Sequence, residues 1–234
     1  MSNDSLRNQL ERHYPHSRSK TQLIEANLPP LSTRKVDGVD HLNIWESGKT
    51  KLGKFLAIAA PNPFVHPVFG PFNSVECFWH YIRSQERDDR LRTMSSAAVR
   101  KFSRRLKTAH TPNFYAVIMY AVWHKLSTNK QMIERLRTND LPLDMYYIFR
   151  DSGLPIRSTS IVWMMPGFVE IEKAVKENRE PDFSFLLSEP TTDLYSPLLP
   201  ENIQATKTDS DSIGNTVDSD ENTVDEDEEV SFNI

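Results

Sequence analysis

A hydrophobic core can come only from the middle of this 234-residue chain, because the apolar side chains are concentrated there. Residues 201–234 carry eleven acidic residues and one lysine, and their few apolar residues cannot offset the entropy of ordering the chain, so we predict a disordered acidic tail. Residues 1–37 are polar with scattered bases and are predicted to form a flexible arm. Residues 38–180 are therefore the predicted folded domain, and residues 181–200 a proline-containing linker.

The charge is distributed as unevenly as the apolar side chains. The formal net charge is −4, but residues 1–200 carry 27 basic and 21 acidic residues. A mildly basic body therefore precedes the acidic tail. A basic body of this kind can attract anionic ligands such as nucleotides or nucleic acids.

The composition excludes several classes of site. A single cysteine, Cys77, excludes an internal disulfide framework and a zinc site built from several cysteines. The seven glycines form neither a dinucleotide-binding nor a P-loop motif. His13 and His16 lie in the polar arm without an adjacent acid, so we predict no metal site and no cofactor. The apolar runs are too short to cross a bilayer, which predicts no membrane partner and a cytoplasmic or nuclear location.

The spacing of apolar residues predicts a compact, predominantly helical α+β domain with a few short strands. Helices are predicted to begin at Ser74, at Ser95-Ser96 and at Thr111-Pro112, and to span Asn129–Arg137 and Phe168–Lys176. Short strands are predicted at Leu42–Trp45, Lys54–Ile58, Met145–Phe149 and Ile161–Met165. The segment Pro61–Pro71 holds four prolines and is predicted to be an irregular loop, because proline fixes φ and donates no hydrogen bond.

Glu76 is the residue with the most suggestive position, because it places a carboxylate in the first turn of an otherwise apolar and aromatic helix. One interpretation is structural: the helix dipole favours an acid there, or Glu76 pairs with His80 one turn later. The other is a half-buried carboxylate that works at the mouth of a pocket. Cys77 and His80 are also spaced as a nucleophile and its base, although a lone cysteine beside Phe78 is more typical of a core.

Several segments of the chain resemble motifs of the NADAR (NAD- and ADP-ribose-associated) superfamily, in the same order and over roughly residues 41–176. The run Phe72-Asn-Ser-Val-Glu76 is similar to the F-P-S-V-E signature of that family. Further similarity lies in Leu42–Glu46, Met94–Arg104, Ile118–Leu126 and Asn129–Thr138. The resemblance implies a compact, mostly helical α+β fold and a metal-independent N-glycosidase that acts on nucleotide-like substrates or removes ADP-ribose from guanine bases.

By its place in the signature, Glu76 matches the catalytic glutamate of the family, and Asp151 is the candidate for a second acidic position. An ADP-ribose-like ligand would suit the basic residues near this helix, and tryptophan rings would suit its base. Surface bases are commonly a solvated face, and Trp79 also lies on the apolar stripe of its helix. The predicted substrate-binding residues are Trp45, Trp79, His80, Arg83, Arg100, Lys101, Arg104 and Arg105.

The chain also departs from the family pattern. Phe55–Ile58 replaces a polar loop, and the four-proline segment stands where the family has a hairpin. In Leu143–Gly153 the family glutamate and its tryptophan–glycine pair are missing. An alternative is therefore a non-catalytic protein of the same fold, which binds a nucleotide or nucleic acid and uses the acidic tail for interaction. The sequence leaves the oligomeric state open.

Overall fold

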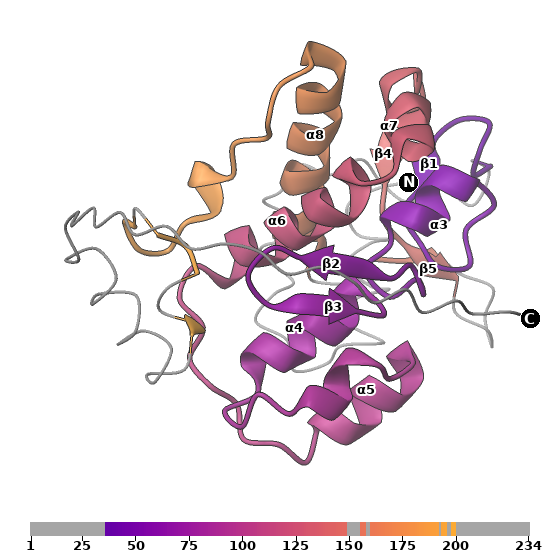
Figure 1. The fold of residues 1–234 in the computed structure, drawn as a ribbon. Helices are drawn as coiled ribbons and strands as arrows, with labels where there is room; N and C mark the ends of the chain where they lie inside the picture. The colour runs from indigo at the N-terminus through magenta and orange to yellow at the C-terminus, as the bar shows by residue number, and fades with distance from the viewer. Residues whose placement is uncertain (1–35, 149–154, 158–159, 192, 196–197, 200–234) are drawn as a thin grey trace, which may run out of the picture. The chain divides into compact units, whose positions relative to one another are not determined.

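The computed structural model describes residues 36–148, 155–157, 160–191, 193–195 and 198–199 (Figure 1). The chain divides after Leu198 into two units, and every described helix and strand belongs to the first. The described residues form six α-helices and three two-stranded sheets. The prediction of a compact, mostly helical α+β domain is therefore confirmed. The predicted arm at 1–37 and the tail at 201–234 lie almost wholly outside the described residues.

Four of the six described helices begin at a side chain that caps the first turn, and the other two have no side-chain cap. They are α3 (Lys51–Leu56), α4 (Val75–Arg83), α5 (Ser96–Ser103), α6 (Phe114–Ser127), α7 (Lys130–Arg137) and α8 (Ile161–Glu177). Side chains of Ser74, Ser95 and Asn129 accept hydrogen bonds from the first turns of α4, α5 and α7, as predicted. Helix α6 instead begins after Asn113, which has a left-handed φ of 53°.

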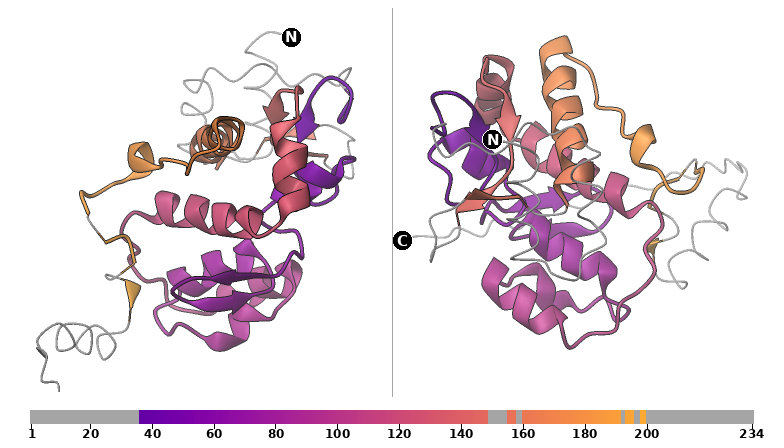
Figure 2. Two further views of the ribbon diagram at one scale, coloured as in Figure 1. Left: turned by 45° about the horizontal axis from the view of Figure 1, so that its top comes forward. Right: turned by 180° about the vertical axis from the view of Figure 1, so that it is seen from behind.

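The core is built around α6, which is buried along most of its length. Figure 2 shows α6 with α4 and the hairpin of β2 and β3 on one side and α8 on the other. Gly167 of α8 lets the two helices approach, because a Cβ there would lie 2.7 Å from Met119 of α6. The core also takes in Phe183, beyond the predicted end of the domain, and Leu198.

Lys125 is a fully buried cation on α6. Its Nζ donates hydrogen bonds to the carbonyl oxygens of Phe55 and Ala57 at 2.6 and 3.1 Å, and so satisfies acceptors at the end of α3. Burial lowers the pKa of Lys125 to about 7. The side chain therefore ties α3 to the central helix.

The strands are short and form three separate pairs. They are β1 (Leu42–Asn43) with β4 (Leu143–Asp144) in parallel, β2 (Phe64–His66) with β3 (Gly70–Phe72) antiparallel, and β5 (Tyr147–Ile148) with β6 (Pro155–Ile156) antiparallel. A short 3₁₀ helix, η1 (Asp89–Arg92), precedes α5, and another, η2 (Ser184–Leu186), follows α8. The strand predicted at Leu42–Trp45 is present but shorter, and the strand predicted at Met145–Phe149 is present as β5.

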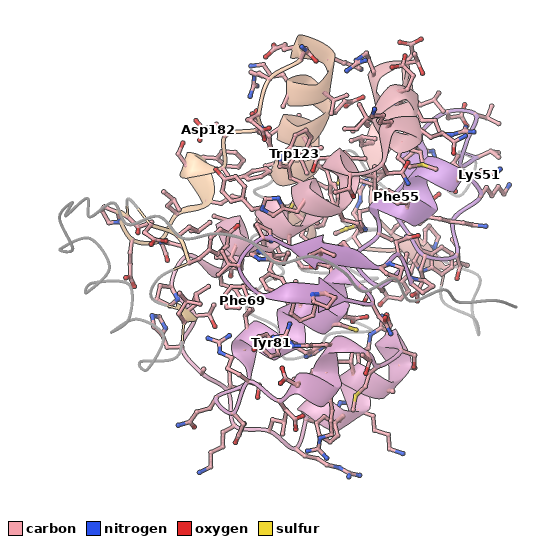
Figure 3. The ribbon with its side chains drawn as sticks, viewed as in Figure 1. Lys51, Phe55, Phe69, Tyr81, Trp123 and Asp182 are labelled. Atoms are coloured by element: carbon pink, nitrogen blue, oxygen red, sulfur yellow. The ribbon has the colours of Figure 1, made fainter. Side chains whose placement is uncertain are left out.

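The four-proline segment is a hairpin rather than an irregular loop, so this prediction was wrong. Pro71 stands in β3 opposite Val65, and a two-stranded sheet has free edges where a missing N–H costs no ladder bond. Nδ1 of His66 accepts hydrogen bonds from the backbone N–H groups of Val68 and Phe69, which closes the turn. Figure 3 shows Phe69 and Tyr81 packed between this hairpin and α4, with ring centroids 6.3 Å apart.

Two other predicted strands are helical. Residues 54–58 contribute to α3 and the turn after it, and Ile161–Met165 forms the first turns of α8. Both are short runs of apolar residues. In so short a run, the spacing of apolar residues cannot distinguish a strand from a buried helix. The helix predicted at Phe168–Lys176 is the continuation of α8, which therefore carries Pro166 in its interior. In the described part of the chain, no helix is long and apolar enough to cross a membrane.

Candidate functional site

A cleft with a volume of about 530 Å³ opens beside the N-terminus of α4. Segments far apart in the sequence line it: the loop after β1, the turn after α3, the starts of α4 and α8, one face of α5 and residues 145–147. The side chains with chemical or stacking potential are Trp45, Glu46, Glu76, Arg100, Tyr146 and Tyr147. We call this the Glu76 cleft.

The backbone around Glu76 is fixed on two sides. Ser74 caps α4, and the N–H of Glu76 donates to the carbonyl of Ile58 at 2.9 Å. The hydroxyl of Ser96, at the start of α5, donates to the carbonyl of Ala59 at 2.5 Å. The turn after α3 is thus held between two helix N-termini, and its apolar residues Ala57, Ile58 and Ala59 form one wall of the cleft, which we call its floor.

Glu76 and Arg100 form a two-point ion pair. Nε of Arg100 donates to Oε1 of Glu76 at 2.6 Å, and its terminal nitrogen donates to Oε2 at 3.0 Å. The Glu76 side chain is only 11% exposed, whereas Arg100 is 47% exposed. The hydrogen bond to Glu76 raises the pKa of Arg100. The predicted pairing of Glu76 with His80 is not the one that forms; the partner comes from α5.

The opposite wall of the cleft is held by side chains that extend the pairing of β1 and β4. The amide of Asn43 accepts from the N–H of Tyr146 at 3.0 Å and donates to its carbonyl at 3.0 Å. Asp37 accepts hydrogen bonds from the N–H groups of Asn43 and Lys49. Tyr146 itself is hydrogen-bonded to His41 at 2.7 Å, and burial raises its pKa to about 12. Tyr146 is therefore a neutral phenol at physiological pH.

Sequence reasoning missed three residues of this cleft as site candidates. Glu46 is a second carboxylate at the rim, and its proximity to Arg100 also raises the pKa of that guanidinium. Tyr146 and Tyr147 come from the segment where β4 leads into β5, about 70 residues after Glu76. Glu46 directly follows Trp45, which was a candidate, and that adjacency was the available signal. The two tyrosines carry none, because strand aromatics are typical of cores.

A second hollow, of about 520 Å³, adjoins the Glu76 cleft at Ser160, which lines both. Four aromatic rings surround it, and Arg83 reaches its edge. Trp79 is among these rings, so it is half-buried in a pocket wall rather than in the centre of the core. We call this the aromatic pocket; its rings are Trp79, Phe114, Tyr115 and Trp163.

A third, smaller hollow of about 150 Å³ takes in most of the remaining predicted residues. His80, Arg83 and Arg104 line it together with Lys107. We call these four residues the basic pocket. The structure thus divides the predicted substrate-binding residues among three neighbouring hollows, with Trp45 and Arg100 in the Glu76 cleft. Lys101 and Arg105 are exposed on and after α5.

The remaining candidates have no place in these hollows. Asp151 lies outside the described residues. Cys77 is fully buried, its thiol is hydrogen-bonded to the carbonyl of Met94 at 3.2 Å, and burial raises its pKa, so the core interpretation of this cysteine holds. His13 and His16 also lie outside the described part, within which no group of three or more potential metal ligands was found.

Comparisons of the chain with protein families, with curated proteins and with solved structures found no match. Function is therefore inferred from the geometry of the Glu76 cleft and its neighbours.

Proposed function

We propose that the Glu76 cleft hydrolyses the N-glycosidic bond of ADP-ribosyl or related nucleotide-sugar groups, including ADP-ribose carried on nucleic-acid bases. The observation that supports this is the position of Glu76: a nearly buried carboxylate on a rigid helix start, facing a cleft large enough for a nucleoside. The resemblance of Phe72–Glu76 to the NADAR signature supports the same substrate class.

The chemistry requires a fixed negative charge beside the anomeric carbon of the sugar. As the bond between C1′ and the base nitrogen breaks, its electron pair leaves with the base, and positive charge develops on the sugar ring. Glu76 would stabilise that charge and take a proton from the attacking water, whose oxygen forms the new bond to C1′. The departing base nitrogen takes up a proton from solvent. Trp45 and Tyr147 would flank the sugar and base as apolar and aromatic walls.

Arg100 has a specific part in this proposal. It occupies both oxygens of Glu76 in the free protein, yet its own side chain is half exposed. A diphosphate would compete for the guanidinium, because arginine binds phosphate in the same two-point manner as carboxylate. We infer that substrate binding draws Arg100 toward the phosphates and frees one oxygen of Glu76.

The same ion pair also favours a second candidate function. A carboxylate with both oxygens engaged is a structural clamp between α4 and α5 if Arg100 stays in place. The protein would then bind a nucleotide or nucleic acid without cleaving it. The two candidates differ in whether Glu76 is needed for turnover or only for stability.

Substitution of Glu76 by glutamine separates them. We expect the wild-type protein to release free ADP-ribose from an oligonucleotide that carries ADP-ribose on a guanine base. Glu76→Gln should lower the rate at least about 100-fold, since it removes both the negative charge and the general base of the reaction. Product release would be followed by chromatography. Glu134→Gln is the matched control, because Glu134 also pairs with an arginine, Arg137, but lies on α7.

This interpretation requires that Glu134→Gln keeps the wild-type activity. It also requires that the Glu76→Gln protein is folded, which circular dichroism measures. If the wild type cleaves the N-glycosidic bond of none of three substrates, namely the ADP-ribosylated oligonucleotide, NAD and riboflavin-pathway intermediates, the enzyme proposal is wrong. Retained binding of ADP-ribose in that case would support the second candidate.

A further inference from the structure

The basic pocket has the size and charge of a phosphate site. It is formed where the end of α4 meets the end of α5 and the segment after it, and its volume is about 150 Å³. His80, Arg83, Arg104 and Lys107 surround it, with the hydroxyls of Ser103 and Thr108. Its walls are joined by backbone hydrogen bonds from Gln85 and Ala109 N–H groups to the carbonyls of Lys107 and Arg83. The backbone that carries the pocket is therefore fixed, while Arg83, Arg104 and Lys107 are exposed on it.

The cations of this pocket are free, in contrast to most other arginines in the described part of the chain. Arg83, Arg104 and Lys107 form no ion pair with any described carboxylate. Glu86, three residues after Arg83 in the chain, accepts a hydrogen bond from Ser84 at 3.1 Å. The arginines that do pair with carboxylates are Arg90, Arg92, Arg100, Arg137, Arg157 and Arg179.

The pKa of His80 is also affected by the neighbouring positive charges. Burial lowers its pKa, and Arg83 and Arg100 lower it further, while Glu76 acts in the opposite direction. A phosphate dianion in the basic pocket would offset the two arginines and favour the protonated imidazole. The histidine would then become an additional donor to the phosphate.

The aromatic pocket next to it has the geometry for a planar base. The ring of Trp163 is stacked on Tyr115, with centroids 4.6 Å apart and planes 24° apart, and it is tilted by 38° against Trp79 at 5.6 Å. Phe114 meets Trp79 edge-on at 4.8 Å and closes one side. These rings line one side of the hollow of about 520 Å³, and half-exposed tryptophan and tyrosine rings at a pocket of this kind are typical stacking platforms for bases.

Arg83 joins the two pockets, because its side chain lines both of them. Its guanidinium lies 5.6 Å from the centre of the Phe114 ring, on the aromatic side, and its charge is unpaired toward the basic side. An aromatic hollow and a phosphate hollow that share one arginine match the two ends of a nucleotide, in which a ribose separates base from phosphate. Neither pocket includes Glu76.

We propose that the aromatic and basic pockets together bind a nucleotide with a terminal phosphate monoester, its base stacked in the aromatic pocket and its phosphate held by Arg83, Arg104 and Lys107. This site is separate from the Glu76 cleft and does not depend on hydrolysis there. The ligand is either a free mononucleotide or the 5′-phosphorylated end of a nucleic-acid strand. Both present the same chemistry to the pockets.

Titration with AMP, adenosine and inorganic phosphate, followed by tryptophan fluorescence and calorimetry, tests the proposal. We expect AMP to bind at least about tenfold more tightly than adenosine, because charge-assisted hydrogen bonds to the phosphate are lost in the nucleoside. Arg104→Gln should weaken AMP binding about tenfold. Arg105→Gln is the matched control: it removes the same charge from the adjacent exposed position, outside the basic pocket, and should change the affinity less than twofold.

Three results would overturn the proposal: no AMP binding, equal affinity for AMP and adenosine, or equal losses in Arg104→Gln and Arg105→Gln, which would indicate diffuse electrostatic attraction. Trp45→Ala locates the ligand, because Trp45 lines the Glu76 cleft but neither of the two proposed pockets. Unchanged AMP affinity in this variant supports the separate site, whereas its loss would place AMP in the Glu76 cleft and refute the proposal.

An oligonucleotide with a 5′-phosphate distinguishes the two possible sources of the phosphate. Tighter binding of the oligonucleotide than of AMP indicates that the ligand is a strand end, and weaker binding indicates a free nucleotide. These binding experiments test the proposed site even if the protein has no glycosidase activity.

Discussion

The imidazole of His66 is held in one protonation state by its surroundings. Its Nδ1 accepts two backbone hydrogen bonds, from Val68 and Phe69, which a doubly protonated ring could not do. The ring is stacked on Phe78 at 4.6 Å and is almost wholly buried. Burial, with a smaller contribution from His124, lowers the pKa of His66 to about 3. The folded protein therefore contains a neutral histidine between pH 3 and 6.5.

This predicts acid destabilisation. In the unfolded chain His66 takes up a proton near pH 6.5, whereas in the folded protein it stays neutral to about pH 3, so the unfolded state binds more protons and stability falls as the pH falls. Between pH 7 and 5 we expect His66 to cost about 2 kcal/mol of unfolding free energy, measured by urea denaturation. In His66→Phe this part of the pH dependence should be missing, even though the variant loses the turn hydrogen bonds. Val65→Ala, at an exposed and non-titrating position of the same strand, should keep the wild-type profile. An unchanged profile in His66→Phe would contradict the assignment.

At the scale of single residues, sequence reasoning located Glu76 because a carboxylate in an apolar first turn is a local anomaly. Its partner Arg100 was one of several bases on the next helix, and the spacing of bases alone does not tell which of them turns inward. Pairings of this kind depend on the packing of α5 against α4, which is a tertiary property.

At the scale of elements, α3 shows why short segments are misassigned. Lys54–Ile58 is predicted to be a strand, and glycine is a poor helix former, so nothing local indicates a helix that includes Gly53. In the structure it is a helical residue, and a Cβ there would lie 2.2 Å from the carbonyl oxygen of Asn43 in β1. The glycine permits the close contact between α3 and β1, and that contact supports the turn that forms the floor of the Glu76 cleft. The hairpin of β2 and β3 was missed because its prolines indicate an irregular loop. In a two-stranded sheet, however, proline is tolerated at the free edges.

Gly53→Ala tests this contact. Alanine is the better helix former by about 1 kcal/mol, so a purely local effect would stabilise the protein. We expect the opposite, a loss of about 1–3 kcal/mol, because the methyl group must displace the backbone of Asn43. Chemical denaturation gives the free energy of unfolding. Lys54→Ala, on the exposed face of the same helix, should change it by less than about 0.5 kcal/mol. A Gly53→Ala protein more stable than the wild type would refute the close contact.

At the scale of the whole molecule, the sequence predicted the class of fold and the helical core around residues 114–126. A long segment with helical spacing of apolar residues forms a helix in most tertiary contexts, so it can be predicted from sequence alone. It did not predict where the packed core extends after α8. The ring of Phe183 is fully buried and meets Tyr120 of α6 edge-on at 4.7 Å, although it follows Pro181 in the segment predicted to be a linker. The apolar residues between Pro181 and Pro190 form a run too short to show a period from which the burial of one member could be inferred; they are Phe183, Phe185, Leu186 and Leu187.

Phe183 and Phe185 form a matched pair for testing this extension of the core. Both belong to the same short segment, yet Phe183 is fully buried and Phe185 is 53% exposed. Phe183→Ala should lower the free energy of unfolding by about 3–5 kcal/mol, because it removes a buried ring and leaves a cavity against α6. Phe185→Ala should lower it by less than about 0.5 kcal/mol. Urea denaturation of the full chain measures both. Equal small effects would show that residues after α8 are dispensable for folding, whereas the expected difference means that a chain truncated near residue 180 loses part of the core.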